Sequence, residues 1–379
     1  MTQVATKAVR QRIRLPYLDG LRGIAALAIA LFHTYKFTGD TGDHEQIPIV
    51  GGVLQFGFLG VPVFIVLSGY LLMLPVAQNA NRLPKGFIYY IRSRARRILP
   101  PYYAALALSL LLILFVPILQ QPSGTQWDSK VPVTVPDVVL HALLLQDFSA
   151  ESIGKINGPL WSVAVEWHIY FLMPLLLLPL WRLIGGTATT LLMLVTSFVL
   201  VLLDVGSFAH PWLVPLFAAG MLAAQVTVRD DVRPWTLVAA AVLTTAGIVG
   251  LGVAFPRGVM AYFAVEVLVG LLLAVGLAAI GPRSAQGRTP KWVGFLESKP
   301  LLTLGLFSYS IYLVHSPLLG LANLLLRPLG LPITAQYLIM TFVILPIVLV
   351  ICYGFFWLVE RHFLNTRQKQ VATHIDALH

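Results

Sequence analysis

Two histidines and one glutamate lie within long apolar stretches of this 379-residue sequence. His33 follows GIAALAIALF, Glu166 lies in WSVAVEWHIYF, and His315 lies in SYSIYLVHSPLL. An ionisable side chain inside an apolar helix is costly, so such residues commonly face a polar interior and take part in function. The three could relay protons, act as general bases or hold a metal ion. No His-Glu-x-x-His spacing unites them, and we expect no metal site.

The first apolar stretch carries charged residues on one helical face. Eleven residues, or about three helical turns, separate Arg22 from His33, so these side chains share a face and lie about 16 Å apart. Asp19 lies on the same side, three residues before Arg22. The stripe predicts a polar path inside a bundle. The alternative is a packing face that ends in an Asp19–Arg22 ion pair.

Two later stretches also place polar residues on single helix faces. The spacing of three or four residues groups Ser162 with Glu166 and Tyr170, and Ser308 with Tyr312 and His315. Counted from the helix ends, His33, Glu166 and His315 should all lie in the outer half of the membrane. Glu266 should lie at a similar depth, where we favour a structural role. For His315, a structural hydrogen bond is the alternative to catalysis.

Four arginines stand close together just before a Pro-Pro pair: Arg92, Arg94, Arg96 and Arg97. Arg94 and Arg97 are three residues apart and can share a helix face. Because the planar guanidinium grips phosphate with several N–H donors, this pair could bind a phosphate-bearing ligand. Alternatively, the cluster anchors anionic lipid headgroups or sets the membrane topology.

Many membrane-spanning helices are needed to position these residues. The chain is 58% hydrophobic and 11% charged, whereas soluble domains are about 45–50% apolar and about 25% charged. This composition disfavours a soluble enzyme and a nucleic-acid-binding module. Continuous apolar runs predict an all-α, polytopic bundle of about ten transmembrane helices. The predicted segments are 18–38, 54–77, 98–119, 160–180, 187–204, 211–227, 235–253, 259–281, 300–322 and 335–359.

The distribution of basic residues predicts the orientation. With both termini in the cytoplasm, 21 of the 26 Lys and Arg residues fall on the inner side, as the positive-inside rule requires. The net charge of +10 is then explained without nucleic acid. We expect a basic cytoplasmic N-terminus over 1–17, one transmembrane domain over 18–359 and a cytoplasmic tail over 360–379.

Five stretches carry most of these polar residues and follow one another over residues 17–318. They are YLDGLRGIAALAIALFH, GFLGVPVFIVLSGYLL, RSRARRILPPYY, GPLWSVAVEWHIYFLMPLLL and FSYSIYLVHSPL. In content and order the set resembles the acyltransferase 3 family of integral membrane O-acyltransferases. Each stretch is weak alone, but the five together are highly specific.

The resemblance implies transfer of an acyl group, usually acetyl, from cytoplasmic acyl-CoA to a hydroxyl group. The acceptor would be a carbohydrate, a glycolipid or a glycosylated natural product. The resemblance assigns the catalytic positions to His33, Glu166 and His315, and the donor-binding positions to Arg22, Arg94 and Arg97. His33 would act as a general base or accept the acyl group transiently.

One departure from the family pattern concerns the orientation of His33. Many members carry an acidic residue after Gly-Val in the second motif, where this sequence has Pro62. An acid–histidine pair therefore cannot be carried over from that position. Asp40 or Asp43, just beyond the first helix, could substitute.

We therefore expect a multi-pass enzyme of a bacterial-type cell membrane, surrounded by membrane lipids. Acyl-CoA, and acetyl-CoA in particular, would be its donor co-substrate, with no tightly bound cofactor and no nucleic-acid partner. The alternative is a proton-coupled transporter or flippase of a lipid-linked or anionic substrate. The sequence shows neither inverted repeats nor paired broken helices, which disfavours transport.

Overall fold

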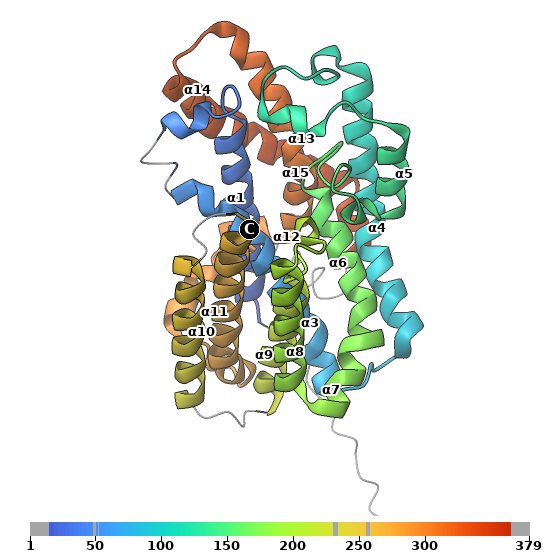
Figure 1. Cartoon of the computed structure of the whole chain (residues 1–379), viewed down its shortest axis with the longest axis vertical. Coiled ribbons are helices and arrows are strands. Elements are labelled where there is room, and N and C mark those ends of the chain that lie inside the picture. The colour runs from blue at the N-terminus through green and yellow to red at the C-terminus, as the bar shows by residue number, and fades with distance from the viewer. Residues whose placement is uncertain (1–14, 48–50, 52, 230–233, 255–257, 365–379) are drawn as a thin grey trace, which may run out of the picture.

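The computed structural model describes residues 15–47, 51, 53–229, 234–254 and 258–364, and every regular element in these ranges is a helix. The α-helices (Figure 1) are α1 (Tyr17–Phe37), α3 (Gly60–Ala77), α4 (Gly86–Phe115), α5 (Val135–Leu143), α6 (Leu160–Leu172), α7 (Leu178–Ile184), α8 (Gly186–Leu202), α9 (Leu213–Arg229), α10 (Pro234–Ala254), α11 (Val259–Ala285), α12 (Lys299–Leu306), α13 (Ser308–Leu326), α14 (Ile333–Ile339) and α15 (Leu345–Leu358). The short 3-10 turns are η1 (Asp43–Gln46), η2 (Gln55–Leu59), η3 (Pro117–Leu119), η4 (Gln126–Lys130), η5 (Gln146–Phe148), η7 (Ser207–Ala209), η8 (Lys291–Glu297), η9 (Arg327–Leu329) and η11 (Glu360–Phe363). Much of the predicted N-terminus (1–17) and of the predicted tail (360–379) lies outside the described residues.

Seven helical stretches of the described chain are long and apolar enough to cross a membrane. They are Gln55–Ala77, Gly86–Phe115, Leu160–Ile184, Ser207–Arg229, Val259–Ala285, Ser308–Leu329 and Ile333–Leu358. Helices α1, α8 and α10 cover the other three predicted segments but are not among the seven. The polytopic helical bundle is therefore confirmed. The count of ten spans and the side of the termini stay predictions.

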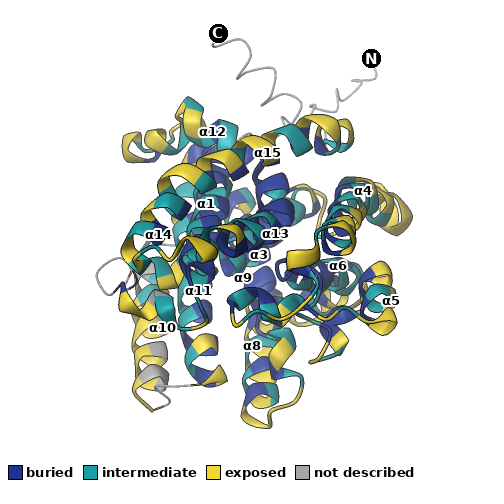
Figure 2. Cartoon of the chain, turned by 90° about the horizontal axis from the view of Figure 1, so that it is seen from above, coloured by how far each residue is buried: buried dark blue, intermediate teal, exposed yellow. Residues whose placement is uncertain are grey.

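The centre of the bundle consists of α1, α3, α9 and α13, where buried residues are concentrated (Figure 2). Helices α3 and α9 cross closely through two glycines. A Cβ atom on Gly69 would overlap the carbonyl oxygen of Phe217, and one on Gly220 would overlap that of Val66. Close backbone approach through small residues is a common way for helices to associate in lipid.

Large apolar side chains cover the outside of the bundle. Leu114 on α4, Leu191 on α8 and Val350 on α15 are all exposed, although their type belongs in a core. An exposed apolar surface of this kind is expected where helices face lipid.

Prolines mark the places where two long helices change pitch. Helix α6 continues into α7 through the π-helical turn Met173–Leu177, which contains Pro174. A second π-helical turn, Met340–Ile344, joins α14 to α15 and is followed by Pro346. Because proline has no N–H to donate, a wider turn accommodates the interrupted hydrogen-bond ladder.

Two predicted segment boundaries were wrong. Helix α4 begins at Gly86 rather than near residue 98, so the arginine cluster lies on the same helix as the apolar segment that follows it. The predicted segment 300–322 is divided at Phe307 into α12 and α13, and α12 packs against α1. Leu15 and Glu360, which flank the predicted domain 18–359, are both buried, and the bounds of that domain stay a prediction.

Candidate active site

His33 on α1 and His315 on α13 are in direct contact. Nδ1 of His315 lies 2.7 Å from the carbonyl oxygen of Ile311, which can only accept, so in the neutral ring this nitrogen carries the hydrogen. Nε2 of His315 is then an acceptor, and it lies 3.0 Å from Nδ1 of His33. The same Nδ1 lies 3.0 Å from the carbonyl oxygen of Ile29. Both contacts assign the hydrogen of neutral His33 to Nδ1, which leaves Nε2 as its basic nitrogen.

The His33 ring lines a cavity of about 740 Å³, here called the histidine cavity. His315 is fully buried behind it. A hydrogen bond to one nitrogen of an imidazole ring fixes the tautomer and the orientation of the ring, and it leaves the other nitrogen for proton transfer. In this chain, which has Pro62 at the position of the acidic residue, His315 and the Ile29 carbonyl group are the polar partners of His33 Nδ1.

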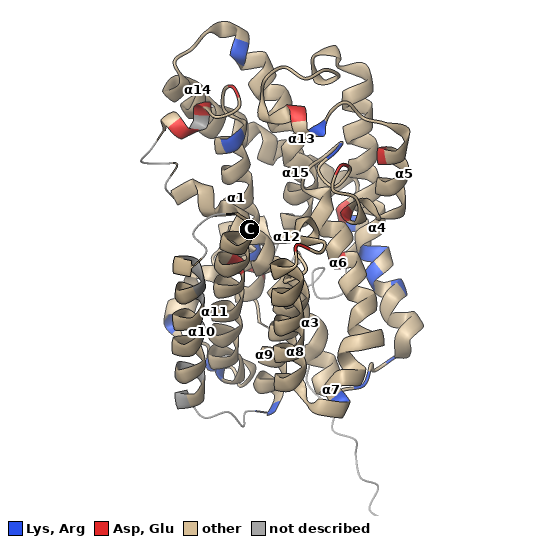
Figure 3. Cartoon of the chain, in the orientation of Figure 1, with Lys and Arg blue, Asp and Glu red and all other residues tan. Residues whose placement is uncertain are grey.

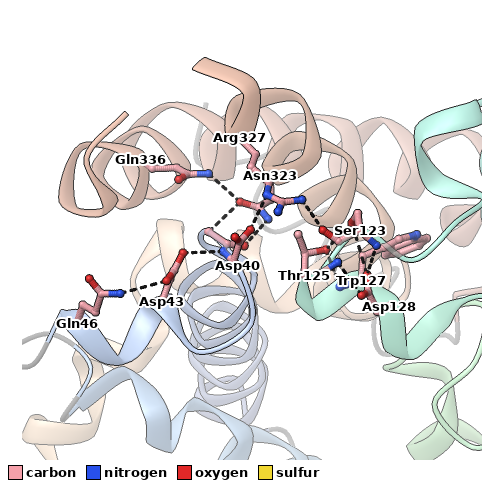
Figure 4. Close-up of polar contacts among 12 residues, drawn as sticks. Asp40, Asp43, Gln46, Ser123, Thr125, Trp127, Asp128, Asn323, Arg327 and Gln336 are labelled. Carbon is pink, nitrogen blue, oxygen red and sulfur yellow. Dashed lines mark hydrogen bonds and ion pairs between the residues drawn. The ribbon is translucent and has the colours of Figure 1, made fainter. Parts of the chain in front are cut away.

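Asp40 and Asp43 do not orient His33; both belong to a network beyond the end of α1 (Figure 4). Asp40 is paired with Arg327, and its backbone N–H donates to Asp43 Oδ2 at 2.9 Å. Gln46 Nε2 donates to Asp43 Oδ1 at 3.0 Å. Arg327 also donates to the carbonyl oxygen of Ser123. The possibility that either aspartate substitutes for the missing acid was therefore wrong.

Arg22, Arg94 and Arg97 meet in a second cavity of about 260 Å³, here called the arginine cavity. Basic segments are visible along α4 in Figure 3. Asp19 and Glu166 also line the arginine cavity, so three guanidinium groups face two carboxylates. Nε of Arg94 is buried with no hydrogen-bond partner among the described residues. This cavity is thus a positively charged site with a donor left over for an anion.

Glu166 lies in the arginine cavity and not with the two histidines. Its Oε1 accepts hydrogen bonds from Ser68 and Tyr170, each at 2.5 Å. It also interacts electrostatically with Arg94. The similar depth expected for Glu166 and His33 stays a prediction, and the two side chains line different cavities.

The two cavities meet at Val61 and Tyr312, which line both. The Tyr312 hydroxyl lies 2.5 Å from Oγ of Ser162. The polar spacings found on α6 and α13 therefore bring these two residues together at the junction. A long ligand entering past the arginines would reach the histidine cavity here.

Two charged groups, one beside the arginine cavity and one on the histidine cavity, were missed by the sequence reasoning. Glu360 lies in η11, inside the predicted tail, and Ser310 donates to its Oε2 from both the backbone N–H (3.0 Å) and the hydroxyl. Burial raises the pKa of Glu360 to about 7, and nearby Arg97 and Arg22 oppose this rise. Lys130, from η4, lines the histidine cavity, and its pKa is lowered to about 8 by burial and by Lys155. Neither residue lies in an apolar stretch, so no local signal distinguished them.

The chain matches known acyltransferases over most of its length. A family model described as an acyltransferase domain matches residues 15–359. The peptidoglycan O-acetyltransferase OatA of Listeria monocytogenes is 25% identical over 336 residues, which cover 82% of this chain and 50% of that protein. The O-acetyltransferase OatA of Staphylococcus aureus (strain NCTC 8325 / PS 47) is 25% identical over 342 residues, covering 82% and 51%. The acyltransferase MdmB of Streptomyces mycarofaciens is 28% identical over 165 residues, covering 43% and 39%.

The chain spans about half the length of the O-acetyltransferases that it matches along most of its own length. No solved structure matches it. The family model covers nearly all of the described bundle and includes the five sequence stretches and both cavities. The chain therefore belongs to the acyltransferase 3 family and is a multi-pass integral membrane protein.

Proposed function

We propose that the protein transfers an acetyl group from acetyl-CoA to a hydroxyl group of a glycan. The observation that carries the proposal is the meeting of the arginine and histidine cavities at Tyr312 and Val61. One cavity offers cationic groups suited to a phosphate-bearing donor. The other offers a neutral imidazole suited to a hydroxyl acceptor. Two relatives named O-acetyltransferases, one of them acting on peptidoglycan, support an acetyl group and a glycan acceptor.

The donor would enter on the arginine side. Arg94 and Arg97 would hold the phosphates, because a guanidinium group binds phosphate through paired N–H donors. Arg22, on the same cavity wall, would add a third cation. The cavity of about 260 Å³ is suited to the pantetheine arm and the thioester rather than to the whole nucleotide.

His33 would act as the general base. Its Nε2 would take the proton of the acceptor hydroxyl as that oxygen attacks the thioester carbonyl carbon. The carbon–sulfur bond of the tetrahedral intermediate then breaks. The proton held by His33 passes to the leaving thiolate, so the products are an acetyl ester and free CoA thiol.

The other predicted catalytic residues would support this step without taking the proton from the acceptor. His315 would hold His33 in the required tautomer through their 3.0 Å contact. Glu166, bound by Ser68 and Tyr170 and close to Arg94, would fix the wall of the arginine cavity.

Incubation of the purified protein with acetyl-CoA tests the proposal. Free CoA thiol is measured with and without a soluble peptidoglycan fragment, and the acetyl ester is detected by mass spectrometry. A Cys352→Ala background removes the single cysteine of the chain from the thiol signal. We expect slow thiol release alone and faster release, with ester formation, when the fragment is present. No thiol release from acetyl-CoA, together with ester formation from another acetyl donor, would contradict the proposed donor.

A further inference from the structure

His210 and Glu266 form a second pair of ionisable groups on the histidine cavity, away from the His33–His315 contact. Both line the cavity, and Nδ1 of His210 lies 3.5 Å from Oε1 of Glu266. His210 has a left-handed backbone (φ 52°) between η7 and α9, a conformation that costs energy in a residue with a side chain. The steps proposed above use neither residue.

Aromatic rings line the same cavity as this pair. The ring of His210 lies 4.4 Å from Trp161, with 31° between their planes. Phe58 also lines the cavity and packs edge-on against Tyr262, with 5.5 Å between ring centroids. All four rings line the histidine cavity. The cavity therefore combines aromatic walls with a few polar groups.

The polar groups of the pair are only partly used within the protein. Trp212 Nε1 donates to Glu266 Oε2 at 2.7 Å, which fixes the carboxylate. Oε1 of Glu266 lies 3.5 Å from Nδ1 of His210, and this buried nitrogen has no hydrogen-bond partner among the described residues. The His210 side chain is 26% exposed and lines the cavity beside Glu266, so this imidazole can offer a polar group to a ligand that carries hydroxyl groups.

We infer that Trp161, His210 and Glu266 form a subsite for a pyranose ring of the acceptor glycan. A sugar ring has apolar C–H faces and polar hydroxyls at its rim, so it needs an aromatic surface next to hydrogen-bonding groups. The volume of about 740 Å³ is within the roughly 300–1,000 Å³ of small-molecule sites and leaves room for more than one ring. The inference rests on the proposed function, because the subsite would hold the sugar whose hydroxyl faces His33 on the same cavity.

The test compares three variants of helix α6. Trp161→Leu removes the aromatic surface, Trp161→Phe keeps a smaller one, and Trp167→Leu is the matched control. Trp167 packs against Phe171 and is not among the residues that line either cavity. Binding of the N-acetylglucosaminyl-N-acetylmuramic acid disaccharide is measured by isothermal titration calorimetry. Acceptor and donor KM values are measured with the same disaccharide and with n-butanol as an acceptor that has no ring.

We expect Trp161→Leu to weaken disaccharide binding and raise the acceptor KM by about tenfold. The phenylalanine variant should lie between it and the unaltered protein. The donor KM, the n-butanol reaction and the Trp167→Leu control should not change. Glu266→Gln should also weaken disaccharide binding, since an amide replaces a charged acceptor.

The inference is overturned if the unaltered protein does not bind the disaccharide, or if Trp161→Leu binds it equally well. It is also overturned if Trp161→Leu affects the n-butanol reaction as strongly as the sugar reaction. The proposed function fails separately: the disaccharide would bind with the expected dependence on Trp161, yet no acetyl group would leave acetyl-CoA.

Discussion

Replacing His315 with leucine tests which of the two paired histidines takes the proton. The leucine fills a fully buried position but removes the acceptor 3.0 Å from Nδ1 of His33. The carbonyl oxygen of Ile29 remains at 3.0 Å from the same nitrogen and keeps the hydrogen there. One intramolecular hydrogen bond contributes about 0.5–1.5 kcal/mol. At about 1.36 kcal/mol per tenfold change in rate, kcat should fall by only about two- to thirteen-fold.

His315→Gln is the matched variant, because its amide oxygen can accept the hydrogen bond from His33. It should therefore keep more activity than His315→Leu. The assay is acceptor-dependent release of CoA thiol by purified protein, with thermal unfolding and acetyl-CoA binding measured on the same samples. The reasoning is refuted if His315→Leu is as inactive as His33→Gln while remaining folded and able to bind acetyl-CoA. His315 would then be the base.

Three further predictions concern topology, donor binding and pH. In a Cys352→Ala background, a cysteine at exposed Ser129 should react with an impermeant thiol reagent in intact cells, whereas one at exposed Gln286 should not; the opposite pattern would reject the predicted orientation. Arg94→Ala with Arg97→Ala should raise the donor KM at least about tenfold, since charged hydrogen bonds contribute about 1.5–3 kcal/mol each. The control, Arg92→Ala with Arg96→Ala, removes the same charge from exposed positions outside the arginine cavity and should leave the donor KM unchanged. If the two double variants raise the donor KM equally, the arginine cluster is better explained as a signal for membrane topology. Because burial raises the pKa of Glu360 to about 7, the residue is neutral below that pH and becomes a carboxylate near Arg97 and Arg22 above it. This carboxylate would compete with the donor phosphates for Arg97 and Arg22, so the donor KM should rise as the pH increases through 7. Glu360→Gln should remove the part of the rise that is due to Glu360. If the variant keeps the pH profile of the unaltered protein, Glu360 does not control donor binding.

The helical bundle was predictable because each long helix requires a continuous apolar run. Helical periodicity also predicted that Arg22 and His33 lie on one face of α1. Arg22 lines the arginine cavity and His33 lines the histidine cavity. Helical spacing likewise identified Ser162 and Tyr312 as members of polar faces. It could not show that the two faces meet at 2.5 Å, because contacts between helices depend on how the bundle packs.

The parts of the site that the sequence did not yield depend on residues far apart in the chain. The His33–His315 contact joins positions 282 residues apart. Asp40 was a reasonable partner for His33 by distance along the chain, but Arg327 pairs with it instead. Glu166 was assigned a depth from its helix alone, and the cavity that it lines is decided by neighbouring helices.

The replacement of His33 by glutamine tests the central claim most directly. Glutamine keeps a hydrogen-bonding side chain but cannot take a proton, and general base catalysis contributes about 10²- to 10⁴-fold. The measurement is transfer of radiolabelled acetyl from acetyl-CoA to a peptidoglycan fragment by the purified variant. His168→Gln, on α6 and outside both cavities, is the control. We predict that His33→Gln loses transfer by at least about a hundredfold and still binds acetyl-CoA. Transfer at the rate of the control would contradict the account.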